Sequence, residues 1–359
     1  MTTPTRRRVL AGLGAAAALP FAPGLARAQD GPLKVGFVYI GPIGDFGWTY
    51  THDQGRLAVE EHFGDAVETV YVENVAEGPD AERIIRQLAE DGAQLIFTTS
   101  FGYMNPTIRV AQQFPDVKFE HATGYQRAEN VAIYNARFYE GRAVTGTMAG
   151  MMSEAGVAGY IASFPIPEVV MGINAFQLAA QRVNPDFRTQ VVWVSTWYDP
   201  AKEADAARAL LDQGADIISQ HTDSPAALQA AEERGAFAFG QASDMSRFAP
   251  NAHLTAIVDN WAPYYIKRVQ AVLDGTWEST DTWAGMPEGE VVISPFRENV
   301  PAEVAAAAQA IIDGTLAGTY HVFTGPIYDQ AGELRVPEGE VLSDADLLTM
   351  DWFVQGVQS

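Results

Sequence analysis

The stretch that decides the fold is residues 33–56, LKVGFVYIGPIGDFGWTYTHDQGR. It opens with an apolar run at residues 35–40, which is typical of a strand buried on both faces of a parallel sheet. A glycine-rich turn follows, and Phe46, Trp48 and Thr49 stand where the first helix should begin. In an open α/β sheet this is the carboxyl end of a strand, the edge at which ligands bind. The stretch predicts a binding crevice, and a helix start with a partly buried tryptophan is the alternative interpretation.

The first 28 residues have the pattern of a twin-arginine export signal. Arg7 and Arg8 precede an apolar run, and Ala26-Arg27-Ala28 supplies the small residues of a cleavage site. The chain has no cysteine, which excludes a disulfide, a thiol nucleophile and a lipid-modified cysteine. We therefore expect a soluble periplasmic protein without a lipid anchor.

Composition and motifs favour a binding protein over an enzyme. The formal net charge of −22 argues against nucleic acid or an anionic membrane as a partner. Dinucleotide and phosphate loops and the Gly-x-Ser-x-Gly elbow are missing from the sequence. The six histidines are scattered without the spacing of a metal site. We expect no catalytic residues, no metal and no cofactor.

The order of elements predicts an α/β protein with two lobes. Strand-like segments alternate with amphipathic helical segments, first through residue 136 and then through a second cycle, which is typical of parallel doubly wound sheets. Two sheets are more economical than one of nine or ten strands, because strongly twisted sheets rarely grow so large. The predicted lobes are residues 30–136 with about 259–292, and residues 137–258 with about 293–359.

Aromatic, amide and acidic side chains recur where the predicted strands end. The candidate ligand-binding residues are Phe46, Trp48, Thr49, Asn105, Phe164, Trp197, Gln241, Asp244 and Asp259. Such groups suit a flat heteroaromatic ligand, because rings stack on its faces while polar groups bind its edge. The alternative is that some of these aromatics close the cores of the lobes, which we expect for Phe101 and consider for Phe164.

Five stretches resemble the basic membrane protein family, the substrate-binding proteins of ABC transporters that are similar to purine-nucleoside-binding proteins. They are GDFGWT at 44–49, DGAQLIFTT at 91–99, RFYEGRAVTGTMAG at 137–150, WYDPAK at 197–202 and GQASD at 240–244. The resemblance implies a type I periplasmic binding fold, in which two Rossmann-like lobes joined by a hinge close on a purine. It also implies a permease as partner, and we expect a monomer.

The resemblance also implies roles for single residues. Trp48 matches an aromatic that stacks on the purine, with Thr49 where relatives usually have Asn, and Trp197 matches the aromatic on the opposite face. Asn105 aligns with an aspartate that binds the edge of the base. Asp244 matches the second acid of the family's Gly-x-Asp-x-Asp stretch, which this sequence keeps.

The positions that hold ribose differ from the family pattern. Ala242 falls on a ribose-binding aspartate, and Asp259 falls on a ribose-binding lysine. Loss of both sugar contacts beside two kept stacking positions favours a free nucleobase such as adenine. The alternatives are a purine nucleoside, then a sugar, then a secreted enzyme of the nucleoside hydrolase type.

Overall fold

The stretch that opens the fold supplies β1, which lies one strand from the edge of a six-stranded parallel sheet. The computed structural model describes residues 31–359, so the predicted signal peptide lies outside the described residues. The strands are β1 (Leu33–Val38), β2 (Val67–Val72), β3 (Leu95–Thr98), β4 (Lys118–Ala122), β5 (Val131–Ala136) and β11 (Asp281–Ala284), in the order β11-β5-β4-β3-β1-β2. Val35 and Phe37 of β1 are fully buried, as the apolar run predicts.

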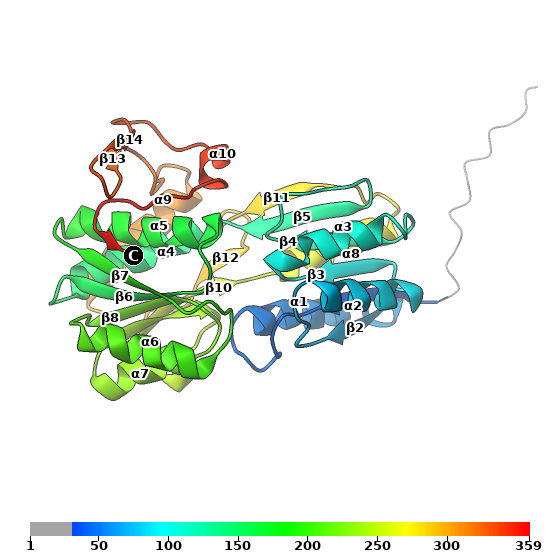
Figure 1. Ribbon diagram of the computed structural model, residues 1–359, viewed down its shortest axis with the longest axis horizontal. Coiled ribbons are helices and arrows are strands. Elements are labelled where there is room, and N and C mark those ends of the chain that lie inside the picture. The colour runs from blue at the N-terminus through cyan, green and yellow to red at the C-terminus, as the bar shows by residue number, and fades with distance from the viewer. Residues whose placement is uncertain (1–30) are drawn as a thin grey trace, which may run out of the picture. The chain divides into compact units, whose positions relative to one another are not determined.

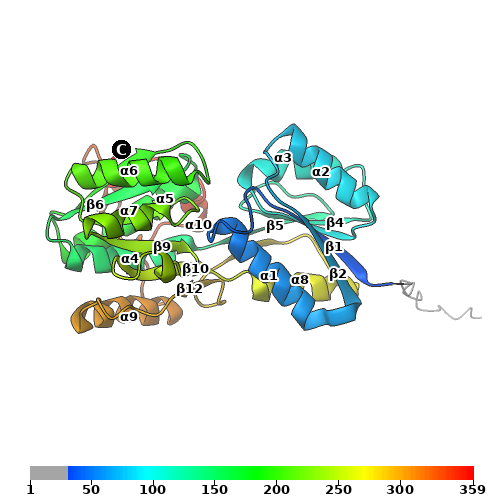
Figure 2. The ribbon, with the colours of Figure 1, turned by 90° about the horizontal axis from the view of Figure 1, so that it is seen from below.

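Two pairs of helices cover the two faces of this sheet. Helices α1 (Trp48–Phe63) and α8 (Ala262–Leu273) pack together on one face, while α2 (Pro79–Glu90) and α3 (Met104–Ala111) lie on the other (Figure 2). We call this sheet and its helices the first lobe. Pro79 opens α2 with Asp80 and Glu82 in its first turn, where proline and acidic residues favour a helix start.

A second sheet of seven strands forms the centre of what we call the second lobe. Its strands are β6 (Val157–Ala162), β7 (Arg188–Trp193), β8 (Ile217–His221), β9 (Phe237–Ala242), β10 (His253–Asp259), β12 (Val291–Ile293) and β15 (Val357–Gln358). The order is β12-β10-β9-β8-β6-β7-β15, and all pairs are parallel except β12 with β10. These parallel sheets confirm the predicted α/β class.

Helices α4 (Phe138–Met152) and α5 (Pro167–Val183) cover one face of the second sheet, and α6 (Pro200–Asp212) and α7 (Ala226–Arg234) cover the other (Figure 1). The first pair approaches closely because α4 carries Gly146 and Gly150. A Cβ atom at Gly146 would lie 2.2 Å from the carbonyl oxygen of Phe176. None of the helices in residues 31–359 combines the length and apolarity that a membrane crossing needs.

The chain passes between the two sheets three times: after β5, after β10, and between β11 and β12. The tail then adds α9 (Ala302–Leu316), which packs on α4, the small hairpin β13 (Ile327–Tyr328) and β14 (Leu334–Val336), and the single turn α10 (Asp344–Leu347). The division into lobes stays a proposal. The boundary at the third crossing, predicted near residue 292, is better placed before Val291, because β12 pairs with the second sheet.

Candidate ligand-binding site

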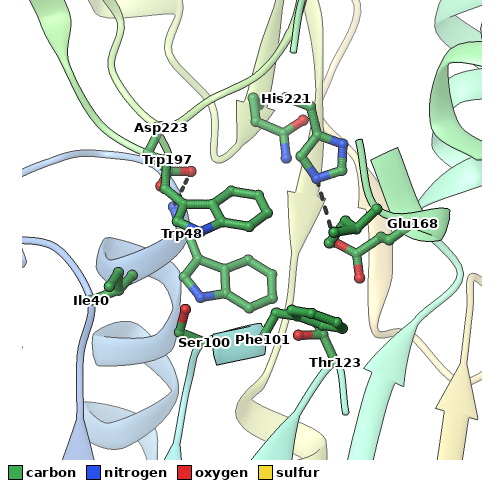
Figure 3. A pocket seen from close by; sticks show the side chains of 11 residues that line it. Ile40, Trp48, Ser100, Phe101, Thr123, Glu168, Trp197, His221 and Asp223 are labelled. Atoms are coloured by element: carbon green, nitrogen blue, oxygen red, sulfur yellow. Dashed lines mark hydrogen bonds and ion pairs between the residues drawn. The ribbon is translucent and has the colours of Figure 1, made fainter. Parts of the chain in front are cut away.

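A cavity with about 400 Å³ of space between its walls lies at the carboxyl ends of strands from both sheets. Its lining residues are Ile40, Trp48, Ser100, Phe101, Thr123, Ile166, Glu168, Trp197, His221, Asp223 and Gln241 (Figure 3). Each of them lies at or shortly after the end of a strand or at the start of the following helix, which is the edge where parallel sheets bind ligands.

Two indole rings dominate the cavity, and Figure 3 shows them one above the other. Trp48 begins α1, and its Nε1 donates a hydrogen bond of 2.6 Å to the carbonyl oxygen of Thr99. Its ring also packs edge-on against Trp261, with the centroids 5.5 Å apart. Trp197 follows β7 on the second lobe and packs against Phe164 at 5.1 Å. Indole rings from both lobes thus line one cavity, and such rings can stack on the face of a flat ligand.

The loop before α1 is held by Asp45 and Thr49. The Asp45 carboxylate accepts hydrogen bonds from the backbone N–H groups of Gly47 and Tyr50, at 2.9 and 3.0 Å, and Thr49 Oγ1 accepts one from Gly41 at 3.1 Å. Burial raises the pKa of Asp45 to about 6. Thr49 thus ties the start of α1 to Gly41 and does not line the cavity.

Asp223 joins this loop to the second lobe. The backbone N–H of Trp48 donates to Asp223 Oδ1 at 3.4 Å, and Gly47 lies so close that an added Cβ would be 2.4 Å from the Asp223 carbonyl oxygen. Burial, together with the nearby carboxylates of Asp45 and Glu203, raises the pKa of Asp223 well above its usual value. The lobes therefore meet at a buried acidic contact.

Glu168 and His221 form one wall of the cavity. His221 Nε2 lies 3.5 Å from Glu168 Oε1, and both side chains are about nine-tenths buried, at 8% and 10% exposed. Burial lowers the pKa of His221, so the imidazole is neutral at pH 7 and donates through Nε2 to the carboxylate. The other oxygen, Glu168 Oε2, is buried without a hydrogen-bond partner among the described residues.

A polar group of Arg142, Gln241 and Asp259 belongs to the same lobe. Arg142 Nη2 donates to Gln241 Oε1, which lines the cavity. Asp259 ends β10, and both of its carboxylate oxygens are buried without a hydrogen-bond partner in the described part of the chain. Burial raises the pKa of Asp259 to about 8, although the charge of Arg142 acts in the opposite direction.

The structure brings three of the predicted site residues, Trp48, Trp197 and Gln241, into this cavity. Asn105 is exposed on α3, because the helix begins at Met104 and turns that side chain toward solvent. Asp244 is also exposed and accepts a hydrogen bond from the backbone of Ser246.

The remaining predicted residues lie behind the lining. Phe46 has a φ of 64° and packs under Arg247, whose guanidinium lies 4.0 Å from the ring centroid. Phe164 supports Trp197 from the side, and Thr49 and Asp259 are buried next to lining residues.

Glu168 was not a candidate from the sequence, and neither were His221 or Asp223. His221 and Asp223 follow the general rule of polar groups at strand ends, so their position at the end of β8 could have indicated them. Glu168 stands after Pro167 in the first turn of α5, and a helix that begins directly beyond a strand end could have indicated it. Within residues 31–359 no group of His, Asp and Glu side chains has the arrangement of a metal site.

Solved structures show that the fold is that of ABC transporter solute-binding proteins. A solute-binding protein from Aeropyrum pernix K1 superposes with a TM-score of 0.71 at 18% identity, covering 80% of this chain and 92% of that one. A second, from Conexibacter woesei, gives 0.66 at 22% identity and covers 80% and 98%. The fold class is therefore that of two α/β sheets with a cavity at their strand ends.

The chain belongs to the Bmp family, described as ABC transporter substrate-binding protein PnrA-like, whose model matches residues 33–314. This confirms the resemblance seen in the sequence. A purine-binding protein of Brucella abortus is 59% identical over 334 residues, which cover 93% of this chain and 95% of the relative. A putative ABC transporter glucose-binding protein of Haloferax volcanii is 39% identical over 327 residues, covering 91% and 80%.

Proposed function

We propose that this substrate-binding protein captures a free purine nucleobase, most favourably adenine, for an ABC importer. The observation that carries the proposal is that two indoles, Trp48 from the first lobe and Trp197 from the second, line one cavity. The relative that is 59% identical is named a purine-binding protein, which supports the ligand class. Ala242 and Asp259, at the positions where the family holds ribose, favour the base over the nucleoside.

The proposed mechanism is capture and closure without catalysis. The base stacks on Trp48 of the first lobe, and hinge motion at the three crossings brings Trp197 of the second lobe over its other face. The closed monomer then docks on the permease. Residues 1–28 would direct the folded protein to the periplasm, where it acts without a lipid anchor.

The first experiment is to denature the purified protein and identify the released small molecule by mass spectrometry. A purine base would support the proposal. Calorimetry with the emptied and refolded protein then compares adenine with adenosine, and we expect adenine to bind at least tenfold more tightly. Tighter binding of adenosine would refute the free-base assignment and favour a nucleoside.

A sugar is the second candidate, because the relative that is 39% identical is named a putative glucose-binding protein. Sugars are also held between aromatic rings, but they present hydroxyl groups around their whole rim. Titration of glucose into the same emptied sample tests this alternative. Release of a sugar on denaturation, or heat on glucose addition without a response to adenine, would replace the purine with a sugar.

A further inference from the structure

We propose that Glu168 is the residue that selects the ligand, by accepting a hydrogen bond from an N–H group on the edge of the stacked base. The inference rests on the proposed function, because it assumes a base between the indoles. The donor is an N–H group of the base. In a purine it comes from an exocyclic amino group or from the ring N–H that a nucleoside lacks.

The geometry leaves Glu168 one oxygen to offer. Its Oε1 faces His221 Nε2 at 3.5 Å, whereas Oε2 is buried with no hydrogen-bond partner among the described residues. Leaving a buried carboxylate oxygen unpaired is costly. A ligand donor that pairs with it therefore contributes more binding free energy than a donor that pairs with a carboxylate exposed to water. Figure 3 shows the Glu168 carboxylate beside the edges of the two indole rings, where the rim of a stacked base would lie.

Three other polar atoms in the lining already have partners. Ser100 Oγ donates to Glu77 at 2.6 Å, and Gln241 Oε1 accepts from Arg142. The Trp48 indole N–H is used by the Thr99 carbonyl. Glu168 Oε2 has no such partner among the described residues, so it is an acceptor that a ligand can use.

Two features hold Glu168 in this role. It stands in the first turn of α5, a helix of 17 residues, where the positive end of the helix favours a negative charge. His221 Nε2 lies 3.5 Å from Glu168 Oε1 and so holds that oxygen on its side of the carboxylate. His221 is a positioning residue in this account, and Glu168 is the contact residue.

The consequence is a rule for the ligand. A base that presents an N–H toward Glu168 is accepted, and one that presents a carbonyl oxygen or a nitrogen lone pair there is rejected, because two acceptors would face each other. Hydrogen bonds to charged groups are worth enough that removal of the donor should weaken binding about tenfold to 150-fold. A sugar on the ring nitrogen would remove that donor.

The test is calorimetry on the emptied full-length mature protein with three ligands. Adenine has both donors, 9-methyladenine keeps the amino group but lacks the ring N–H, and unsubstituted purine keeps the ring N–H but lacks the amino group. Wild type should bind one of the two analogues at least tenfold more weakly than adenine, and the analogue that suffers identifies the donor. This comparison needs no variant.

The same series on Glu168→Gln shows whether Glu168 causes the difference. We expect adenine to weaken about tenfold or more and the penalty of the poorer analogue to shrink by a similar factor, because ligand and residue share one interaction. The matched control is Glu303→Gln, which removes an exposed first-turn carboxylate from α9 outside the cavity and should reproduce wild type.

Two results would overturn the inference while the proposed function stands. One is equal affinity of wild type for all three ligands, and the other is an analogue penalty that persists undiminished in Glu168→Gln, as a steric effect of the methyl group would. If wild type binds none of these purines, the proposed function fails and this inference fails with it.

Discussion

Replacement of Trp197 by alanine is the most direct measure of the stacking site. Its indole packs against Phe164 with centroids 5.1 Å apart, lies 6.5 Å from the His221 ring and is itself only partly buried. Stacking of a base on one aromatic side chain is worth about 1–3 kcal/mol. The dissociation constant for adenine should therefore rise by roughly 5-fold to 150-fold in Trp197→Ala. Trp197→Phe, which keeps a ring, should lose much less.

Calorimetry on the emptied protein gives the affinity, and thermal unfolding without ligand shows whether the fold is intact. Trp193→Ala is the matched control. This half-buried tryptophan ends β7 only four residues earlier, but it does not line the cavity. Its indole N–H donates a hydrogen bond of 3.0 Å to Ser359 Oγ. Trp193→Ala should bind adenine like wild type. Trp197→Ala with an unchanged melting temperature and an affinity within twofold of wild type would refute a stacking role for this indole.

Three further variants test other parts of the site. Trp48→Ala should weaken adenine binding and also lower the melting temperature of the ligand-free protein, because the indole bonds Thr99 and packs on Trp261; a fall in affinity alone would contradict this dual role. Gly47→Ala should weaken binding at least tenfold and shift small-angle scattering of the adenine-loaded protein toward a more open form, because the new Cβ would lie 2.4 Å from a backbone oxygen of the second lobe; wild-type affinity would refute the contact. Asp259→Asn should raise the melting temperature more at pH 8 than at pH 5. Burial raises the pKa of Asp259 to about 8, so the folded protein keeps a proton that the unfolded chain releases above about pH 4. The free energy of unfolding of the wild type therefore falls between about pH 4 and about pH 8, by at most ~1.4 kcal/mol per pH unit. An equal gain in melting temperature at both pH values would show that this carboxyl does not titrate as described.

The fold could be predicted because its signal is local and repeated. The apolar run at β1 and the alternation of strands and helices each report burial and periodicity, and the two sheets follow them. The ring positions Trp48 and Trp197 could be predicted for a related reason, since each directly follows a strand or opens the helix after it. Strand order places such residues at one edge whatever the details of packing.

The polar part of the site could not be predicted in the same way, because it depends on side-chain direction. Asn105 follows β3 by only a few residues, yet one turn of 3-10 helix at Phe101–Tyr103 precedes it and α3 then turns it outward. Glu168 follows β6 at a similar separation, but it stands at the second position of α5, and the carboxylate stays at the cavity. The same spacing from a strand thus gives an exposed amide in one lobe and a buried acceptor in the other.

The arrangement of the first loop explains how ligand binding and lobe closure are coupled. Trp48 supplies the stacking ring through its side chain and donates its backbone N–H to Asp223 of the second lobe. Burial and, next to it, the charge of Asp45, which holds the start of the same helix, raise the pKa of Asp223. Bringing the lobes together at this contact therefore places two carboxyl groups close to each other, which is unfavourable. In the proposed complex, a base stacked between the indoles would offset that cost, because only a closed form would cover both of its faces. We therefore expect the ligand-free protein to be more open in solution than the adenine complex, which small-angle scattering of both forms would show; equal dimensions would mean that closure needs no ligand.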